Sequence, residues 1–290
     1  MIAHPFTLHR PTQQAAGLVL TSPHSGRCYP QALLQASRLD AKTLRSSEDA
    51  FVDELFGLAP ALGIPLLLAE FPRAWCDANR EPWELDPTMF AEPLPAYVNT
   101  TSPRVAAGLG TVPRNVGFGE AIYKRKLPFR EAERRVEACW QPFHAALAGL
   151  IDECRRDFGH CLVLDCHSMP SPLGRAGPRP NLVLGDNYGA SCLPIWSREI
   201  ESSLSALGFT IARNTPYAGG FITRHYACPA KGVQVIQLEL SRALYMDEQA
   251  LTLKPDAADI TERLMIFLGG LVLKLQDFEA RTYSCTQAAE

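Results

Sequence analysis

Six short apolar runs recur along the chain, and each one ends at polar or turn-forming residues. They occupy residues 17–22, 66–69, 161–166, 181–185, 209–213 and 233–240. Apolar runs of this length, bounded by such residues, are typical of buried β-strands. The sequence therefore predicts a sheet whose strands are separated by long stretches of chain.

The segments between the runs have helical periodicity. They cover residues 48–60, 129–157, 190–207 and 256–276. The second is the clearest, with apolar side chains three or four positions apart at Val136, Trp140, Phe143, Leu147 and Leu150. Alternating strands and helices predict an α/β fold in which helices cover both faces of the sheet.

Residues 71–118 are rich in proline and glycine and lack periodicity. A stretch this long is usually a functional loop or lid rather than a linker. There is no internal repeat or low-complexity tract. We therefore expect a single domain over residues 1–290 with an elaborated loop region at about 71–118.

In open α/β sheets, ligands bind beyond the carboxyl ends of the strands. The polar residues that follow the apolar runs are therefore the candidates for a site. They are His24, Asp77 to Arg80, His167, Arg213 with Asn214, and Glu239. Imidazoles, carboxylates and guanidinium groups thus come from distant parts of the sequence to what we expect to be one edge of a sheet.

The two histidines have similar settings. His24 follows a strand that stops at Pro23, and His167 lies at the end of another apolar run, two positions after Asp165. An imidazole at a strand tip can bind a divalent metal, and Asp165 could orient that of His167. Taken alone, His24 is better explained as a turn residue bonded to backbone. A second histidine in the same setting strengthens the metal interpretation of both.

A third metal ligand could come from Glu48 or Asp49. Both follow two serines, and the simplest explanation is an N-cap at Ser46 or Ser47 with acidic residues in the first helical turn. The alternative is that one carboxylate turns to a metal. The pattern does not choose between Glu48 and Asp49.

Three further features indicate a bound anion and a reactive carboxylate. Asn79 and Arg80 could clamp a carboxylate, although Arg80 could equally be a surface partner of Asp77. Glu239 interrupts an apolar strand, which is unfavourable unless the carboxylate is functional or ion-paired, for example with Arg242 or Arg213. The third feature, residues 215–224, offers a mobile or closely approached loop and a second anion contact. Its relevant residues are Gly219, Gly220 and Arg224.

Composition narrows the class of protein. The net charge of −3 shows no basic surplus, which argues against nucleic acid as the main partner, because phosphate binding needs clustered lysine and arginine. The nine cysteines are odd in number, form no CxxC pair and partly lie in apolar runs, which favours reduced thiols and a cytoplasmic protein. We expect no signal peptide and no membrane span, because no apolar run approaches the roughly 20 residues of a span.

Together these motifs resemble the N-formylglutamate amidohydrolase family. The similarity covers nearly the whole chain. It rests on Pro23-His-Ser-Gly, Asp77-Ala-Asn-Arg, Asp165-Cys-His-Ser-Met, Pro216-Tyr-Ala-Gly-Gly and Gln237-Leu-Glu-Leu-Ser-Arg. The family is distantly similar to zinc carboxypeptidases and aspartoacylases. The resemblance implies a three-layer α/β/α sandwich with a mixed central sheet, like that of the zinc exopeptidases and phosphorylase/hydrolase-like proteins.

The resemblance also implies the site and the reaction. It places one divalent metal, most simply zinc, on His24, Asp49 and His167. It gives the substrate carboxylate to Asn79 and Arg80, with Arg224 as a further contact, and makes Glu239 the general base. The implied reaction converts N-formyl-L-glutamate to formate and L-glutamate, a closing step of histidine degradation.

The sequence departs from the carboxypeptidase pattern at one point. A glutamate ligand there follows the first histidine by three positions, where this chain has Arg27. Two alternatives stay open: hydrolysis of another N-acylamino acid or of a peptide terminus, and a binding protein that has lost catalysis. The sequence leaves the physiological metal, the acyl chain length and the oligomeric state open.

Overall fold

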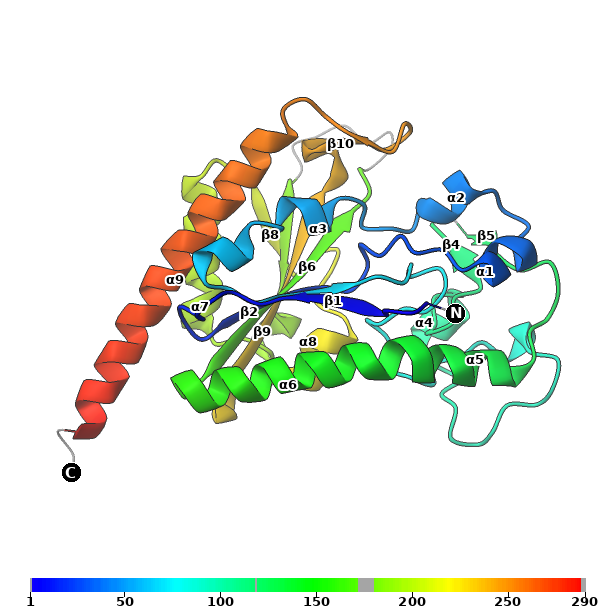
Figure 1. Ribbon diagram of the computed structural model, residues 1–290, viewed down its shortest axis with the longest axis horizontal. Helices are drawn as coiled ribbons and strands as arrows, with labels where there is room; N and C mark the ends of the chain where they lie inside the picture. Colours follow the sequence, from blue (N-terminus) through cyan, green and yellow to red (C-terminus); the bar gives the residue numbers. More distant parts are fainter. Residues whose placement is uncertain (1, 118, 172–179, 288–290) are drawn as a thin grey trace. The chain divides into compact units, whose positions relative to one another are not determined.

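The computed structural model describes residues 2–117, 119–171 and 180–287, and its main element is a seven-stranded sheet (Figure 1). The strand order is β1-β3-β2-β6-β9-β7-β8. The strands are β1 (Phe6–His9), β2 (Leu18–Ser22), β3 (Leu66–Ala69), β6 (Cys161–Met169), β7 (Leu182–Gly185), β8 (Ile211–Arg213) and β9 (Val233–Ser241). The six strands expected from apolar runs are all present, and β1 is additional.

The sheet is mixed, as predicted. Strands β2, β6 and β9 are parallel neighbours, whereas β7 runs antiparallel to β9 and parallel to β8. The central strands are buried along their whole length, because crossover helices cover both faces of such a sheet. The carboxyl ends of β2, β6 and β9 consequently share one edge, where a ligand site is expected.

The chain divides into two compact units. The first comprises Met1–Thr7, Pro23–Ala50 and Leu68–Leu147, and the second comprises Leu8–Ser22, Phe51–Leu67 and Ala148–Glu290. The single domain expected over residues 1–290 stays a prediction.

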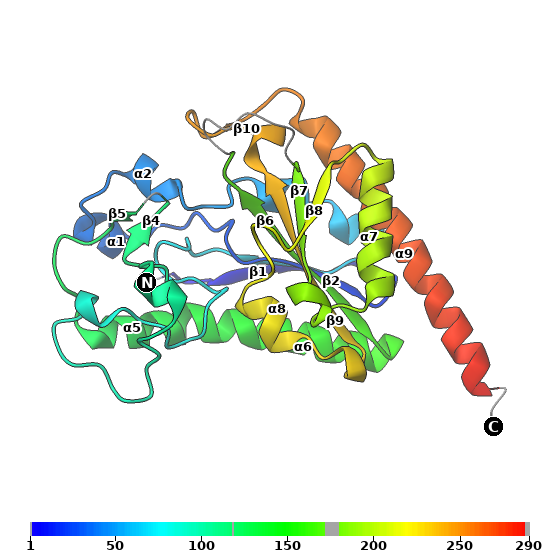
Figure 2. The same ribbon diagram turned by 180° about the vertical axis from the view of Figure 1, so that it is seen from behind.

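The second unit holds β2, β6, β7, β8 and β9 together with helices on both faces of the sheet (Figures 1 and 2). Helix α9 packs against α3 and α7, and α8 packs against β9. These helices are α3 (Val52–Leu55), α7 (Pro194–Ala206), α8 (Phe221–Tyr226) and α9 (Ala257–Gln287). A small hairpin of β10 (Met246–Asp247) and β11 (Thr252–Leu253) precedes α9.

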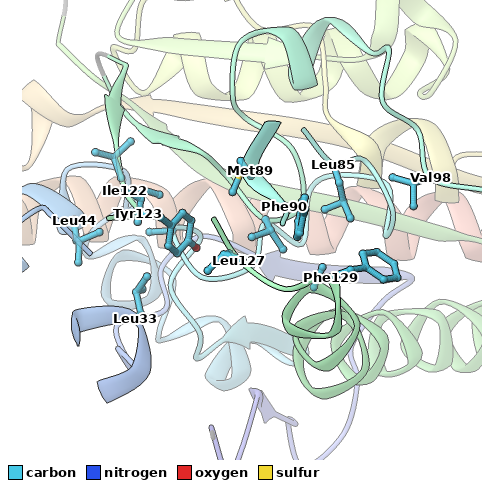
Figure 3. Packing of buried hydrophobic residues seen from close by; sticks show 14 residues of the cluster. Leu33, Leu44, Leu85, Met89, Phe90, Val98, Ile122, Tyr123, Leu127 and Phe129 are labelled. Atoms are coloured by element: carbon cyan, nitrogen blue, oxygen red, sulfur yellow. The ribbon is translucent and has the colours of Figure 1, made fainter. Parts of the chain in front are cut away.

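The first unit has its own hydrophobic cluster (Figure 3). The cluster brings Leu33, Leu85, Phe90, Ile122 and Phe129 together from segments far apart in sequence. Regular structure is sparse around it. It consists of α1 (Gln31–Ala36), α2 (Ala41–Arg45), α4 (Pro103–Ala106), α5 (Phe129–Arg135) and a hairpin of β4 (Asn115–Val116) and β5 (Glu120–Ala121).

The long helix predicted over 129–157 is present. Helix α5 continues through one π-helical turn, Val136–Trp140, into α6 (Gln141–Phe158). In the described part of the chain, no helix combines the length and apolar content that crossing a membrane requires.

The helix predicted over residues 48–60 is wrong in extent. Only α3 and the 3₁₀ turn Ala59–Leu62 form there. Phe51, with a φ of 66°, departs from helical geometry directly before α3. The hydroxyls of Ser46 and Ser47 donate to the carbonyls of Thr43 and Leu44, at the end of α2. The serines therefore do not cap a following helix, and Glu48 and Asp49 lie in a loop.

Candidate metal centre and active site

His24 is held by two carboxylates within the first unit. It lies two residues beyond β2 and is buried. Its Nε2 is 2.6 Å from Oδ1 of Asp77, and its Nδ1 is 3.3 Å from Oδ2 of Asp49. The backbone N–H of Asp49 donates to the carbonyl of His24 at 3.0 Å, so the two chain segments are joined directly.

Gly26 allows this turn to pack closely on another segment. A Cβ atom at Gly26 would lie 2.3 Å from the carbonyl oxygen of Phe71. Any larger residue would push the turn away from the segment that leads to Asp77. The glycine is thus required by a close approach of two backbones rather than by an unusual φ.

Asp77 has several cationic neighbours. Its Oδ2 is 2.9 Å from a terminal nitrogen of Arg73 and 3.7 Å from one of Arg80. Burial opposes ionisation, but the charges of Arg80, His24 and Arg73 outweigh it and hold the pKa of Asp77 well below its usual range. An ionised Asp77 accepts a hydrogen bond from His24 Nε2–H and thereby leaves Nδ1 as the nitrogen that faces Asp49.

Glu48 and Asp49 have different environments. The carboxylate of Glu48 accepts a hydrogen bond from the Tyr29 hydroxyl at 2.6 Å and pairs with Arg45 at 3.1 Å. Burial, followed by the charge of Glu48, raises the pKa of Tyr29 well above its ordinary value. Glu48 therefore stabilises the loop, whereas Asp49 faces the imidazole of His24.

In the second unit, His167 and Glu239 are direct neighbours in the sheet. They are Cα partners in the parallel pair of β6 and β9, so both side chains project from the same face. Nε2 of His167 is 3.0 Å from Oδ2 of Asp165, the neighbour two positions earlier on the strand. The side-chain amide of Gln237 donates to Oε1 of Glu239 at 2.6 Å. Each of the two functional candidates is thus oriented by a residue of its own strand.

The glycine loop after β8 packs on this same face. Gly185 pairs with Gln237, and a Cβ atom at Gly185 would lie 2.8 Å from the backbone nitrogen of Gly219. Gly219 itself has a φ of +125°, a backbone angle that residues with a side chain rarely adopt. The loop backbone therefore packs against Gly185, on the face of the sheet that also carries Gln237 and Glu239. Arg224 is exposed, and its Nη1 lies 3.4 Å from the carbonyl oxygen of Gly219.

The arginines considered as partners of Glu239 have other carboxylates nearby. Arg213 pairs with Glu201 at 2.7 Å, and Arg242 lies 4.0 Å from Glu248. Arg242 also donates to the Ser168 hydroxyl at 3.1 Å. Both arginines thus have polar neighbours other than Glu239.

His24, Asp49 and His167 form a group that can hold a metal. Each is buried and offers one ligand atom, and these atoms all lie within 4.8 Å of one another. Zinc bonds of about 2.0–2.1 Å in tetrahedral geometry would put two ligand atoms about 3.4 Å apart. The 3.3 Å between His24 Nδ1 and Asp49 Oδ2 fits that spacing. Two imidazoles and one carboxylate are also a common donor set of catalytic zinc.

The sheet topology accounts for the two histidines. Thr21 of β2 is the ladder partner of Asp165 in β6, and the ladder runs in parallel. His24 lies three residues after Thr21, and His167 lies two residues after Asp165. The two histidines therefore lie in or just beyond the strands of one parallel pair.

Comparison with known proteins decides the family. A model of the N-formylglutamate amidohydrolase family matches residues 16–246. The chain belongs to this family. All the candidate residues of the site lie inside the matched range.

Members of the N-formylglutamate amidohydrolase family resemble the chain over most of its length. An N-formylglutamate deformylase of Pseudomonas putida is 30% identical over 84% of this chain and 88% of its own length. One of Pseudomonas aeruginosa is 30% identical over 86% of this chain and 89% of its own. The crystal structure of N-formylglutamate amidohydrolase from Ralstonia eutropha JMP134 has a TM-score of 0.88 and 32% identity, covering 94% of this chain and 99% of that one.

Within this family member, Arg80 is rigidly held. Its Nε donates to the carbonyl of Leu109 at 2.8 Å and its Nη1 to that of Asn79 at 2.7 Å. Desolvation by burial lowers the pKa of Arg80 to about 10, and the group remains protonated at neutral pH. Sequence reasoning treated Asp77 only as an alternative partner of Arg80 and missed its bond to His24.

Proposed function

We propose that the chain hydrolyses N-formyl-L-glutamate to formate and L-glutamate with one divalent metal, most simply zinc. The observation that carries the proposal is the group of His24, Asp49 and His167, with Glu239 next to His167 in the sheet. The names of relatives that are 30% and 32% identical over most of the chain support the substrate. They also make a protein of another class a weaker alternative.

Asp77 and Asp165 would fix the two imidazoles. Each lies within hydrogen-bonding distance of an Nε2 atom, so each can hold its histidine in the tautomer that presents Nδ1. A zinc ion held by His24, Asp49 and His167 would lower the pKa of a bound water and polarise the substrate carbonyl.

Glu239 would act as the general base. It takes a proton from the attacking water and returns it to the nitrogen of the leaving glutamate, and the C–N amide bond breaks. Gln237 orients the carboxylate through its 2.6 Å hydrogen bond. Because β9 is a central, fully buried strand, the base is held on a rigid element.

Asn79, Arg80 and Arg224 would bind the substrate carboxylates. The guanidinium of Arg80 is already oriented by two backbone carbonyls, so little side-chain entropy is lost on binding. Gly219 and Gly220 would let the backbone approach the substrate closely. Binding the remote carboxylates positions the formyl carbon for attack.

We further propose a cytoplasmic role in a closing step of histidine degradation. The eight cysteines whose side chains are described are all free thiols, which fits a reducing compartment; the side chain of Cys285 lies outside the described set.

Arg80→Ala is expected to lower kcat/KM for N-formyl-L-glutamate roughly 100-fold or more, because a charge-assisted contact to the substrate is lost. Initial rates on the purified variant check this. Arg73→Ala is the matched control, since it removes the other arginine beside Asp77. If Arg80→Ala keeps near-normal activity, Arg80 is only a structural partner of Asp77.

A substrate panel tests the proposed function. Purified protein of known metal content is assayed with N-formyl-L-glutamate, N-acetyl-L-glutamate, N-formyl-L-leucine and a peptide ending in glutamate. We expect N-formyl-L-glutamate to have the highest kcat/KM. Faster turnover of the acetyl compound or the peptide would favour the other hydrolases. A metal-loaded protein that hydrolyses none of them would favour a binding protein.

A further inference from the structure

A strongly basic pocket lies in the first unit, and it includes none of the residues assigned above to the reaction. Its volume is about 290 Å³, close to the lower end of the range for small-molecule sites. Five of its nine lining residues are basic, and none is acidic. The five are Arg38, Arg114, Lys124, Arg125 and Lys126. Such a concentration is unexpected in a chain whose net charge is −3.

Backbone hydrogen bonds bring these basic residues together from three segments. The N–H of Arg38 donates to the carbonyl of Ile122, and the N–H of Ile122 donates to that of Arg114, both at 2.8 Å. The N–H of Lys124 donates to the carbonyl of Ala36 at 3.0 Å. The pocket is therefore part of the folded backbone arrangement rather than a chance meeting of flexible side chains.

The basic residues Lys124 to Lys126 are also attached to the hydrophobic cluster of this unit. Leu127 donates its N–H to the carbonyl of Met89, and Met89 and Tyr123 line the pocket while belonging to the hydrophobic cluster (Figure 3). The run Lys124 to Lys126 is thus held between Tyr123 and Leu127, which both belong to this cluster. The three side chains are exposed, so a dissolved ligand can reach them.

The positive charge is poorly balanced by the protein. Among the residues that the structure describes, Asp86 is the one carboxylate that pairs with any of the five, at 2.8 Å from Arg114. Arg38 and Lys124 donate to the carbonyl oxygens of Tyr123 and Gln35, which do not neutralise them. Crowded like charges repel one another, and a bound anion would relieve that repulsion.

The buried guanidinium of Arg135 contacts Tyr123, which lines the pocket, and adds to the positive potential there. Arg135 donates to the hydroxyl of Tyr123 at 2.6 Å, and its guanidinium lies 3.7 Å from the centre of the Trp75 ring. Within the described residues its Nε has no hydrogen-bond partner, and no carboxylate pairs with it. The aromatic faces stabilise Arg135, but its charge is left to act on the pocket.

We propose that this pocket binds a small anion with two or more negative charges, of the phosphate-bearing class. A phosphate group concentrates about −1.5 to −2 charges and accepts several hydrogen bonds, which suits a site with five cations. The proposal goes beyond the hydrolytic function and does not depend on it.

Calorimetric titration of the full-length protein tests the site, with pyrophosphate and citrate as probes at about 0.15 M ionic strength. The pocket variant is Arg125→Ala with Lys126→Ala. The control is Arg130→Ala with Arg156→Ala, which removes the same charge from exposed positions on α5 and α6. Melting temperatures of all three proteins show that each is folded. Chelation of a bound metal would appear equally in all three.

We expect saturable binding of pyrophosphate, weakened roughly tenfold or more in the pocket variant and by no more than about twofold in the control. Tighter binding of pyrophosphate than citrate supports a phosphate-bearing ligand, and the reverse overturns that class in favour of a polycarboxylate. The proposal is overturned if no multivalent anion saturates, or if both double variants bind equally. It is also overturned if a single-stranded oligonucleotide binds through these residues far more tightly than pyrophosphate.

Discussion

Replacing Glu239 with glutamine is expected to lower kcat by roughly 10²–10⁴-fold, the usual contribution of general acid–base catalysis. Glutamine keeps the shape of the side chain and can still accept a hydrogen bond from Gln237, but it cannot take the proton of the attacking water. Metal content and melting temperature should therefore change little. The measurements are the rate of formate release, the metal content and the melting temperature of the same preparation.

Glu199→Gln is the matched control for Glu239→Gln. It makes the same chemical change in a glutamate of the second unit that pairs with Lys274, outside the proposed site. It should retain the wild-type rate. If Glu239 is instead half of a buried ion pair, its substitution will cost roughly 3–5 kcal/mol of stability, and activity will fall with unfolding. A stable, metal-loaded and fully active Glu239→Gln enzyme would refute the role of Glu239 as base.

Asp49→Asn and Glu48→Gln form a second pair with opposite expected effects. Asp49→Asn should weaken metal affinity by more than the roughly 10–100-fold that follows loss of a residue supporting a ligand, because Asp49 is itself a proposed ligand. Glu48→Gln should keep the metal and lose stability, since Glu48 contacts Tyr29 and Arg45. Metal content after dialysis and melting temperature distinguish the two. Normal metal affinity in Asp49→Asn, with loss in Glu48→Gln, would move the third ligand to Glu48.

The strand tips could be predicted from sequence because burial leaves a simple pattern. The apolar runs that became β2, β6 and β9 are buried along their whole length, so their ends are visible where polar residues begin. This pattern is what singles out His24, His167 and Glu239 as candidate site residues. Parallel pairing then places the ends of these strands at one edge, which local sequence alone does not show.

The environment of Asp49, the proposed third ligand, could not be predicted in the same way. It depends on the positive φ of Phe51 and on two serines that end α2, and both departures oppose the helical pattern of the segment. The bond between His24 and Asp77 joins residues 53 positions apart. The basic pocket likewise forms from three segments whose hydrogen bonds have no sequence signature. These features arise from packing between distant segments.

The central claim is a hydrolase that needs one metal per chain, and metal titration tests it most directly. Metal-stripped protein is supplied with increasing zinc, and formate and glutamate released from N-formyl-L-glutamate are both measured. We predict equal amounts of the two products and a rate that rises linearly to a break at one equivalent of zinc. Full activity in the metal-free protein, or no formate release at any metal concentration, would contradict the account.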